Sequence, residues 1–175
     1  REEILQRAAR WKDLKGFSEG LQDSHLPECR KTTFSVIGFQ VPENAGQGGV
    51  NSPVGKEAAM NAAIPISEGF NLGFVKCRPG MGVLMHNHDT NETFVVMTGM
   101  WRVEWNDAPH TEALEVGPHD IISFPPGCAR RFENITRGEA DVEHTLLFVI
   151  GGDAPQNEFT PASMRRVAEF ERMGA

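Results

Sequence analysis

Short runs of apolar residues, many of them alternating with polar ones, follow one another along most of this chain. The expected strands cover residues 32–40, 70–77, 83–88, 92–98, 101–105, 112–116, 121–124, 130–134 and 144–150. The breaks between them contain Gly, Pro, Asn and Asp, which are the residues that form turns. Strands at this spacing with no helices between them predict an all-β sandwich or closed barrel.

Helical periodicity is expected only near the two ends. Residues 2–14 carry apolar side chains at helical spacing, and Thr160 followed by Pro161 is typical of an N-cap and first helical position. Residues 42–61 are rich in Gly, Asn and Pro without periodicity, so we expect a long loop that covers the barrel mouth. The predicted organisation is an N-terminal helical extension (1–31), a barrel (32–155) and a C-terminal helix (156–175).

Composition and charge narrow the possible partners. The 175 residues suit one domain, and a net charge of −7 makes a nucleic-acid partner unexpected. No apolar run approaches 18 residues and no signal-peptide pattern is present, so a membrane partner is not expected either. The three cysteines are far apart and odd in number, which favours a reducing, cytoplasmic compartment.

The candidate chemistry lies around one turn. His86 and His88 are two residues apart in an expected strand, so both imidazoles point to the same face. If residues 89–91 form a three-residue hairpin loop, His88 pairs directly across from Glu92, with Cβ atoms about 5 Å apart. Two imidazoles and a carboxylate are the facial donor set that suits Fe(II) and also accepts Mn, Co, Ni or Zn. The alternative is a solvated polar turn, which the apolar residues on the same predicted face argue against.

This stretch resembles the first motif of the cupin superfamily. The motif runs Gly, five residues, His-x-His, three residues, Glu, six residues and Gly, and it matches from Gly80 to Gly99. The resemblance implies a jelly-roll β-barrel (a double-stranded β-helix), here a single barrel of the cupin-2 type with short terminal helices. It also implies a divalent transition metal, with Fe most expected, on His86, His88 and Glu92, as in quercetin and gentisate dioxygenases.

The second cupin motif is recognisable but altered. Its Pro125, Gly127 and Asn134 are in place, whereas His119 replaces a Gly and Arg130 stands where the third metal-binding His belongs. The alternation of this strand predicts that Arg130 faces inward, and an arginine cannot deprotonate to become a ligand.

Two interpretations of Arg130 remain open. In the first, its guanidinium acts in catalysis by holding the carboxylate or enolate of a substrate beside a three-ligand metal. In the second, Arg130 pairs with Glu92 and the barrel is metal-free. A buried cation close to a metal ion is costly unless an anion lies between them, so the second interpretation is serious.

The absence of tyrosine narrows the activities that the resemblance implies. Cupin sugar-nucleotide epimerases, sulfoniopropionate lyases and cysteine dioxygenases all depend on a Tyr. The leading hypothesis is therefore a metal-dependent oxidoreductase, a dioxygenase acting on a small organic acid or enol. The alternatives are a barrel that binds a small anionic molecule without catalysis, and a metal-dependent isomerase. Because the strands around the motif appear apolar on both faces, we also expect a homodimer.

Overall fold

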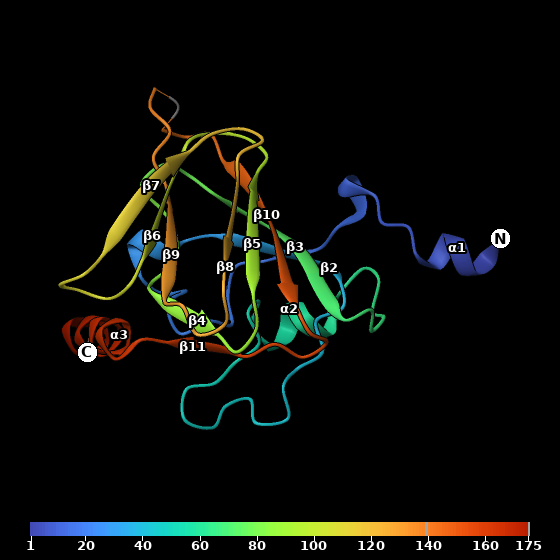
Figure 1. Cartoon of the computed structure of the whole chain (residues 1–175), viewed down its shortest axis with the longest axis horizontal. Coiled ribbons are helices and arrows are strands. Elements are labelled where there is room, and N and C mark those ends of the chain that lie inside the picture. Colours follow the sequence, from blue (N-terminus) through green and yellow to red (C-terminus); the bar gives the residue numbers. More distant parts are fainter. Residues whose placement is uncertain (139, 175) are drawn as a thin grey trace.

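The computed structural model describes residues 1–138 and 140–174, and strands dominate it (Figure 1). Three helices are α1 (Glu2–Gln6), α2 (Lys56–Met60) and α3 (Pro161–Gly174). The strands are β1 (Gly16–Phe17), β2 (Thr32–Ile37), β3 (Phe70–Cys77), β4 (His86–His88), β5 (Glu92–Val96), β6 (Trp101–Trp105), β7 (Glu112–Val116), β8 (Ile121–Phe124), β9 (Arg130–Asn134), β10 (His144–Gly151) and β11 (Asn157–Phe159). Two 3-10 turns, Trp11–Asp13 and Pro27–Cys29, complete the described elements.

The described strands form two antiparallel sheets that face each other as a jelly-roll barrel (Figure 1). The six-stranded sheet has the order β1-β2-β3-β10-β5-β8, and the five-stranded sheet has the order β11-β4-β9-β6-β7. Most long strands bury every second residue, which is the pattern of a sheet with one face turned to a core. The all-β jelly-roll prediction is therefore confirmed.

The core between the sheets is built largely from aromatic and branched side chains. Phe94 and Phe132 come from opposite sheets, and their rings meet edge to face at 5.4 Å between centroids. Trp101 is fully buried and contacts Phe132 in the same way at 5.8 Å, with its Nε1 donating to the Thr98 carbonyl. Edge-to-face contacts of this kind add to the stabilisation from area burial alone. The Phe94–Phe132 contact joins the two sheets, and Trp101 packs beside it within the five-stranded sheet.

The predicted hairpin between residues 88 and 92 is wrong. β4 belongs to the five-stranded sheet and β5 to the six-stranded sheet, so the turn between them is a corner that joins the two sheets. His88 pairs with Asn157 on β11, and Glu92 pairs with Phe124 and Ile150. His88 and Glu92 still face each other, because each side chain points into the interior from its own sheet.

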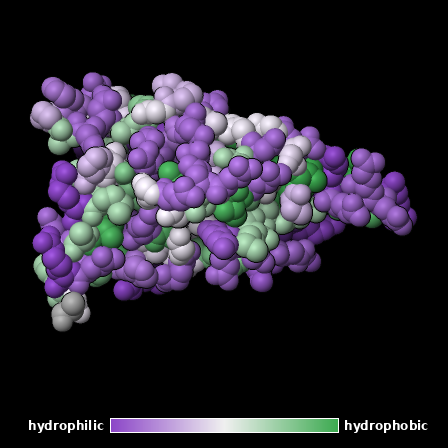
Figure 2. Space-filling view, turned by 90° about the horizontal axis from the view of Figure 1, so that it is seen from below, coloured by the Kyte–Doolittle hydropathy of each residue, from purple (hydrophilic) through white to green (hydrophobic). Residues whose placement is uncertain are grey.

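The terminal segments also differ from the predictions. The N-terminal helix ends at Gln6 instead of continuing to residue 14, because α1 buries no residue and a helix this short gains little stability on its own. Trp11 instead packs on Phe34 and Phe74, with ring centroids 5.2 and 5.1 Å away. The resulting arm projects from the barrel (Figure 1), and this end of the molecule is mainly hydrophilic in Figure 2.

Two further differences concern the regions predicted as a loop and as a C-terminal helix. Residues 42–61 contain α2, whose Ala58 and Ala59 are buried in the core. β11 precedes α3 and belongs to a sheet, so the barrel extends beyond residue 155, while residue 175 of the predicted helix lies outside the described residues. None of the described helices has the length and apolar character needed to cross a bilayer.

Candidate metal centre

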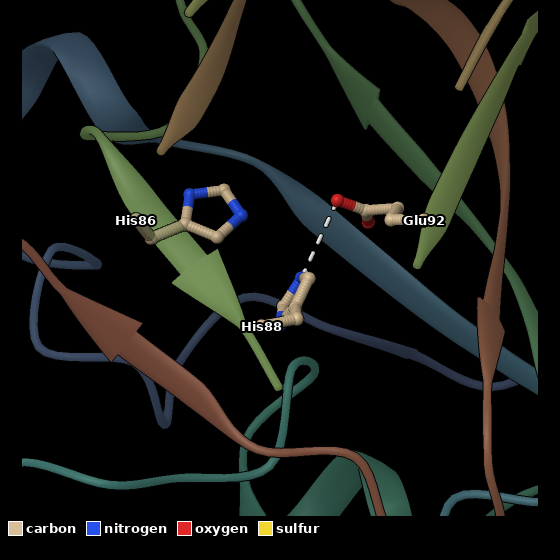
Figure 3. Close-up of side chains that lie close together, drawn as sticks. All are labelled: His86, His88 and Glu92. Atoms are coloured by element: carbon tan, nitrogen blue, oxygen red, sulfur yellow. Dashed lines mark ion pairs between the residues drawn. The ribbon is translucent and has the colours of Figure 1, made fainter. Parts of the chain in front are cut away.

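His86, His88 and Glu92 come together inside the barrel at the corner between the two sheets (Figure 3). The alternation of β4 turns both imidazoles inward and leaves Asn87 between them on the outer face. Glu92 is the first residue of β5 and faces them from the other sheet. All three side chains are buried, and their potential ligand atoms lie within 4.8 Å of one another.

Backbone carbonyls orient both imidazoles. Nδ1 of His86 lies 2.8 Å from the Leu84 carbonyl oxygen, and Nδ1 of His88 lies 2.7 Å from that of Gln156. Because a carbonyl only accepts, both Nδ1 atoms carry the proton. The neutral form of each imidazole then carries a lone pair on Nε2, which is the tautomer that metal-binding histidines usually take. Nε2 of His88 lies 3.3 Å from Oε2 of Glu92, a contact that a bound metal ion would replace.

Burial and nearby charges set the ionisation of the cluster. Burial, together with the charges of His88 and Arg130, lowers the pKa of His86 to about 3. Burial raises the pKa of Glu92, but the charge and hydrogen bond of His88 and the charge of Arg130 outweigh it, and the pKa falls to about 2. Neutral His86 and ionised Glu92 are the forms that bind metal.

The three residues fit a divalent transition metal. Their two nitrogens and one carboxylate oxygen form the facial donor set. Three donors that bind one ion in a facial arrangement, with bonds of about 2.1 Å, lie about 3 Å from one another, so side-chain shifts of about 1 Å would bring these atoms onto an ion. Among the residues that the structure describes, this is the one group of three or more His, Cys, Asp or Glu residues placed closely enough to hold an ion.

Arg130 lies directly beside this cluster and is fully buried. It pairs with His86 in the register of β4 and β9, and its Nε donates to Oε2 of Glu92 at 2.9 Å. Nη1 donates to the Cys128 carbonyl at 2.7 Å, while Nη2 has no hydrogen-bond partner in the described chain. The contact with Glu92 is the one that the metal-free interpretation expects, and Nη2 remains able to donate to a ligand.

Sequence reasoning missed three polar residues that share a cavity with the cluster. The cavity measures about 30 Å³, and Lys31, Thr33 and Asn157 line it together with the metal-site residues. Lys31 and Thr33 are two residues apart and both are buried. The alternation of β2 could therefore have predicted that Lys31 faces the interior. Nothing in the local sequence around Asn157 indicates that β11 would place it beside His88.

A buried ion pair supports the metal site from one side. Nζ of Lys31 donates to Oδ1 of Asp23 at 2.9 Å and to the Cys29 carbonyl at 3.1 Å. The other Asp23 oxygen accepts from the Leu84 backbone N–H at 3.1 Å, and the Leu84 carbonyl in turn accepts from His86. Asp23 therefore fixes the residue whose carbonyl orients a metal-site imidazole.

Two further histidines lie away from the metal centre. His144 is six residues from Ile150, the β10 partner of Glu92, which is roughly 20 Å along a strand. His119 is exposed at a turn and takes a positive φ of 73°, close to the range that the glycine of the cupin motif adopts freely. Neither residue contributes to the metal centre.

Comparison with known proteins identifies the family. No protein-family model matches the chain. Protein SchB of Streptomyces halstedii is 32% identical over 123 residues, which are 69% of this chain and 80% of SchB. The chain therefore belongs to the family of SchB.

Solved structures agree on the fold. The cupin-2 domain Rru_A2000 of Rhodospirillum rubrum has a TM-score of 0.54 at 16% identity, over 94% of this chain and 92% of that one. The vicilin of Solanum melongena has a TM-score of 0.58 at 13% identity over 95% of this chain, and the oxalate decarboxylase of Lactobacillus farciminis has 0.53 at 14% over 89%. This chain spans 38% of each of the last two proteins. Its barrel, with both histidine and glutamate positions of the first motif in the interior, has the cupin fold.

Proposed function

We propose that this protein is a metal-dependent cupin oxidoreductase, a dioxygenase that acts on a small organic acid or enol. The observation that carries the proposal is the convergence of His86, His88 and Glu92, with both Nδ1 atoms bound to carbonyls. Their donor set suits Fe(II) best, and Mn, Ni, Co and Zn are also compatible with it. When bound, such an ion would supply Lewis acidity and, where it is redox-active, electron transfer to and from oxygen.

The chain's own residues have distinct roles in this proposal. Arg130 keeps Glu92 ionised, and its unpartnered Nη2 donates to a negatively charged oxygen of the substrate. The apolar side chains that line the cavity, among them Val75, Phe148 and Ile150, exclude water and so strengthen these polar contacts. The oxalate decarboxylase with a similar barrel is named for a small organic acid, the substrate class proposed here.

A second candidate is a barrel that binds an anion without a metal. The 2.9 Å contact between Arg130 Nε and Glu92 favours it, because a guanidinium already neutralises the carboxylate. A metal-dependent isomerase is a third candidate, and it would convert its substrate without consuming O₂. An O₂-uptake assay with Fe(II) and a set of enol acids separates the first candidate from the other two.

We further propose that the protein is a cytoplasmic homodimer. Its three cysteines are free thiols, which suits a reducing compartment. Edge strand β8 exposes Ile121, which is 66% accessible, and Met97, the residue that follows the neighbouring strand β5, is 41% accessible. Sedimentation equilibrium of the wild type and of Ile121→Asp tests the dimer, and a monomeric wild type would contradict it.

The metal is tested by elemental analysis of protein purified without a metal-affinity tag, beside His86→Ala and Arg130→His. Near-stoichiometric Fe, Mn, Ni, Co or Zn in the wild type, lost in His86→Ala, supports the proposed centre. A wild type without metal, with metal appearing only in Arg130→His, supports the metal-free binding barrel. Metal retained at wild-type stoichiometry in His86→Ala would refute the assignment of the ligands.

A further inference from the structure

Asn157 carries a buried hydrogen-bond donor that the fold does not use. The residue is 3% exposed, and its side-chain Nδ2 has no partner among the described residues. Its backbone is fully engaged, because its N–H donates to the Asn51 carbonyl at 2.7 Å and its carbonyl accepts from the Asn51 N–H at 3.0 Å. Buried amide groups without a partner are rare and require a physical explanation.

The position of Asn157 suggests that explanation. It lies directly across from His88 in the β11–β4 register, and it lines the same cavity as His86, His88 and Glu92. Lys31 lines this cavity as well, and its ammonium, which forms two hydrogen bonds within the described residues, has a third N–H to donate. The metal cavity is thus bordered by unused N–H donors, and an oxygen atom is their natural partner.

The charges around the cavity determine what kind of oxygen fits. Asp23 and Glu92 contribute two negative charges, and Lys31 and Arg130 contribute two positive ones, so the buried side chains sum to zero. A divalent ion on the histidines and Glu92 therefore adds two positive charges that no buried side chain compensates. An uncompensated charge in a low-dielectric interior is costly, and an anionic ligand removes that cost.

We propose that Asn157 is a ligand-binding residue whose Nδ2 donates to a carboxylate oxygen of a small organic acid held at the metal centre. This inference rests on the proposed function in that the acid shares the site with the metal. Asn157 thereby selects a ligand with an acceptor oxygen beside His88, which a group that carries only hydrogen-bond donors at that position would not satisfy.

The same residue connects the ligand to the cover of the cavity. At about 30 Å³ the cavity has room for one or two water molecules, so most acids enter only when its walls move. Pro53 lines the cavity, and its segment is attached to Asn157 through the Asn51 backbone bridge beneath β4 and β11 (Figure 1). Displacement of this segment therefore both admits a ligand and exposes the Asn157 amide.

The test compares Asn157→Leu, which keeps the size and removes the donor, with Asn87→Leu on the outer face of the same corner. Zn²⁺-loaded proteins are titrated with formate and acetate, with acetamide as the neutral probe, and isothermal titration calorimetry measures the affinity of each variant. In the wild type, the Asn157 side-chain ¹⁵N–¹H signals are also followed by NMR. We expect formate and acetate to shift these signals, and acetamide to bind at least tenfold more weakly. Loss of a hydrogen bond to a charged group should weaken carboxylate binding about tenfold or more in Asn157→Leu. Zn²⁺ affinity should stay within twofold, and Asn87→Leu should match the wild type.

The outcomes separate the two proposals. If the wild type binds Zn²⁺ and Asn157→Leu binds carboxylates as tightly as the wild type, the Asn157 inference is wrong and the metal centre stands. If the wild type binds no Zn²⁺, the proposed function fails, and the same titration of metal-free protein decides the inference. If carboxylates do not shift the Asn157 side-chain signals in either the Zn²⁺-loaded or the metal-free protein, the Asn157 inference is wrong.

Discussion

Among the described residues, two pairs of a carboxylate with a lysine or arginine are buried, and in each pair the carboxylate also contacts other groups. Glu92 pairs with Arg130 and belongs to the metal centre, while Asp23 pairs with Lys31 and holds the Leu84 backbone N–H. A buried pair adds little net stability, yet removing one member leaves a charge without compensation. We therefore expect that replacing one member of a buried pair lowers the free energy of unfolding strongly. Replacing both members with apolar residues should lower it much less.

Substitution of Asp23 provides a direct check of this expectation. Asp23→Ala should lower the free energy of unfolding of the metal-free protein by about 3–5 kcal/mol, because Lys31 stays buried and unpaired. The double variant Asp23→Ala/Lys31→Met should recover a large part of the loss. Urea unfolding with EDTA measures both, and Lys76→Met, which breaks a partly exposed pair with Glu143, should change the value by at most about 1 kcal/mol. A double variant no more stable than Asp23→Ala would contradict the argument.

The three cysteines differ in their expected reactivity. Burial raises the pKa of both Cys29 and Cys77 to about 12, and both side chains are almost inaccessible. Since the thiolate is the reactive form, neither should react in the native state at pH 8. Cys128 is partly exposed. Titration with Ellman's reagent should give one fast thiol that disappears in Cys128→Ser, and all three after denaturation. Fast reaction of two or more native thiols would show that the barrel opens readily.

At the scale of secondary structure, the local pattern predicted the bounds of most strands well, but it predicted less well which strands pair with each other. β3, β6, β7, β8 and β9 have the bounds that alternation and turn residues predict. β1 and β11 contain two and three residues, too few to show a period, so they were not predicted. The corner between β4 and β5 was predicted as a hairpin, because a short turn looks the same whether its strands stay in one sheet or change sheets.

The difference between local pattern and long-range pairing also explains how much of the candidate site could be predicted from the sequence. His86, His88 and Glu92 were found from their spacing, and alternation predicted that Arg130 faces inward, where it is fully buried. Asp23 and Asn157 were not found, because their burial depends on contacts with residues more than 60 positions away. A local pattern can identify which residues face the interior, but not which distant polar groups meet them there.

The start of α3 is the clearest test of a local signal. Thr160 precedes Pro161, and its Oγ1 accepts a hydrogen bond from the Ser163 backbone N–H at 3.4 Å, as expected of an N-cap. Thr160→Ala should lower the free energy of unfolding by about 1 kcal/mol, whereas Thr160→Ser should stay close to the wild type. Urea unfolding checks the size of the loss, and faster amide exchange confined to α3 would locate it. Equal stability of both variants would mean that the contacts of Ser163 with Met85 define this end alone.

At the scale of the whole molecule, the net charge of −7 comes from residues outside the buried core. The four buried side chains of the two ion pairs cancel, so the excess of acidic residues lies among exposed and half-buried positions. Such a surface repels anions at long range, and salt screens this repulsion. Recognition of an anionic substrate must therefore come from groups inside the barrel, and its affinity should be higher at high ionic strength than at low.

The buried cluster should also make the stability of the metal-free barrel depend on pH. The pKa of His86 falls from 6.5 to about 3 on folding, and that of Glu92 falls from 4.5 to about 2. Below pH 6.5 the unfolded chain therefore takes up a proton at His86 that the folded chain refuses, and below pH 4.5 the same holds for Glu92. Both effects reduce stability as the pH falls, and each fully titrating group contributes about 1.4 kcal/mol per pH unit.

The contribution of His86 can be isolated between pH 6.5 and about pH 5.5, a full unit above the unfolded pKa of Glu92, where that carboxyl is ionised in both states. Urea unfolding with EDTA should show the free energy of unfolding of the wild type decreasing across this range. In His86→Gln the decrease should be smaller by close to the effect of one proton, because the variant has no imidazole to protonate on unfolding. His110→Gln, which removes an exposed histidine, should keep the wild-type slope. Parallel slopes for the wild type and His86→Gln would mean that the folded barrel accepts a proton on His86, and its Nε2 would then not be held ready for a metal.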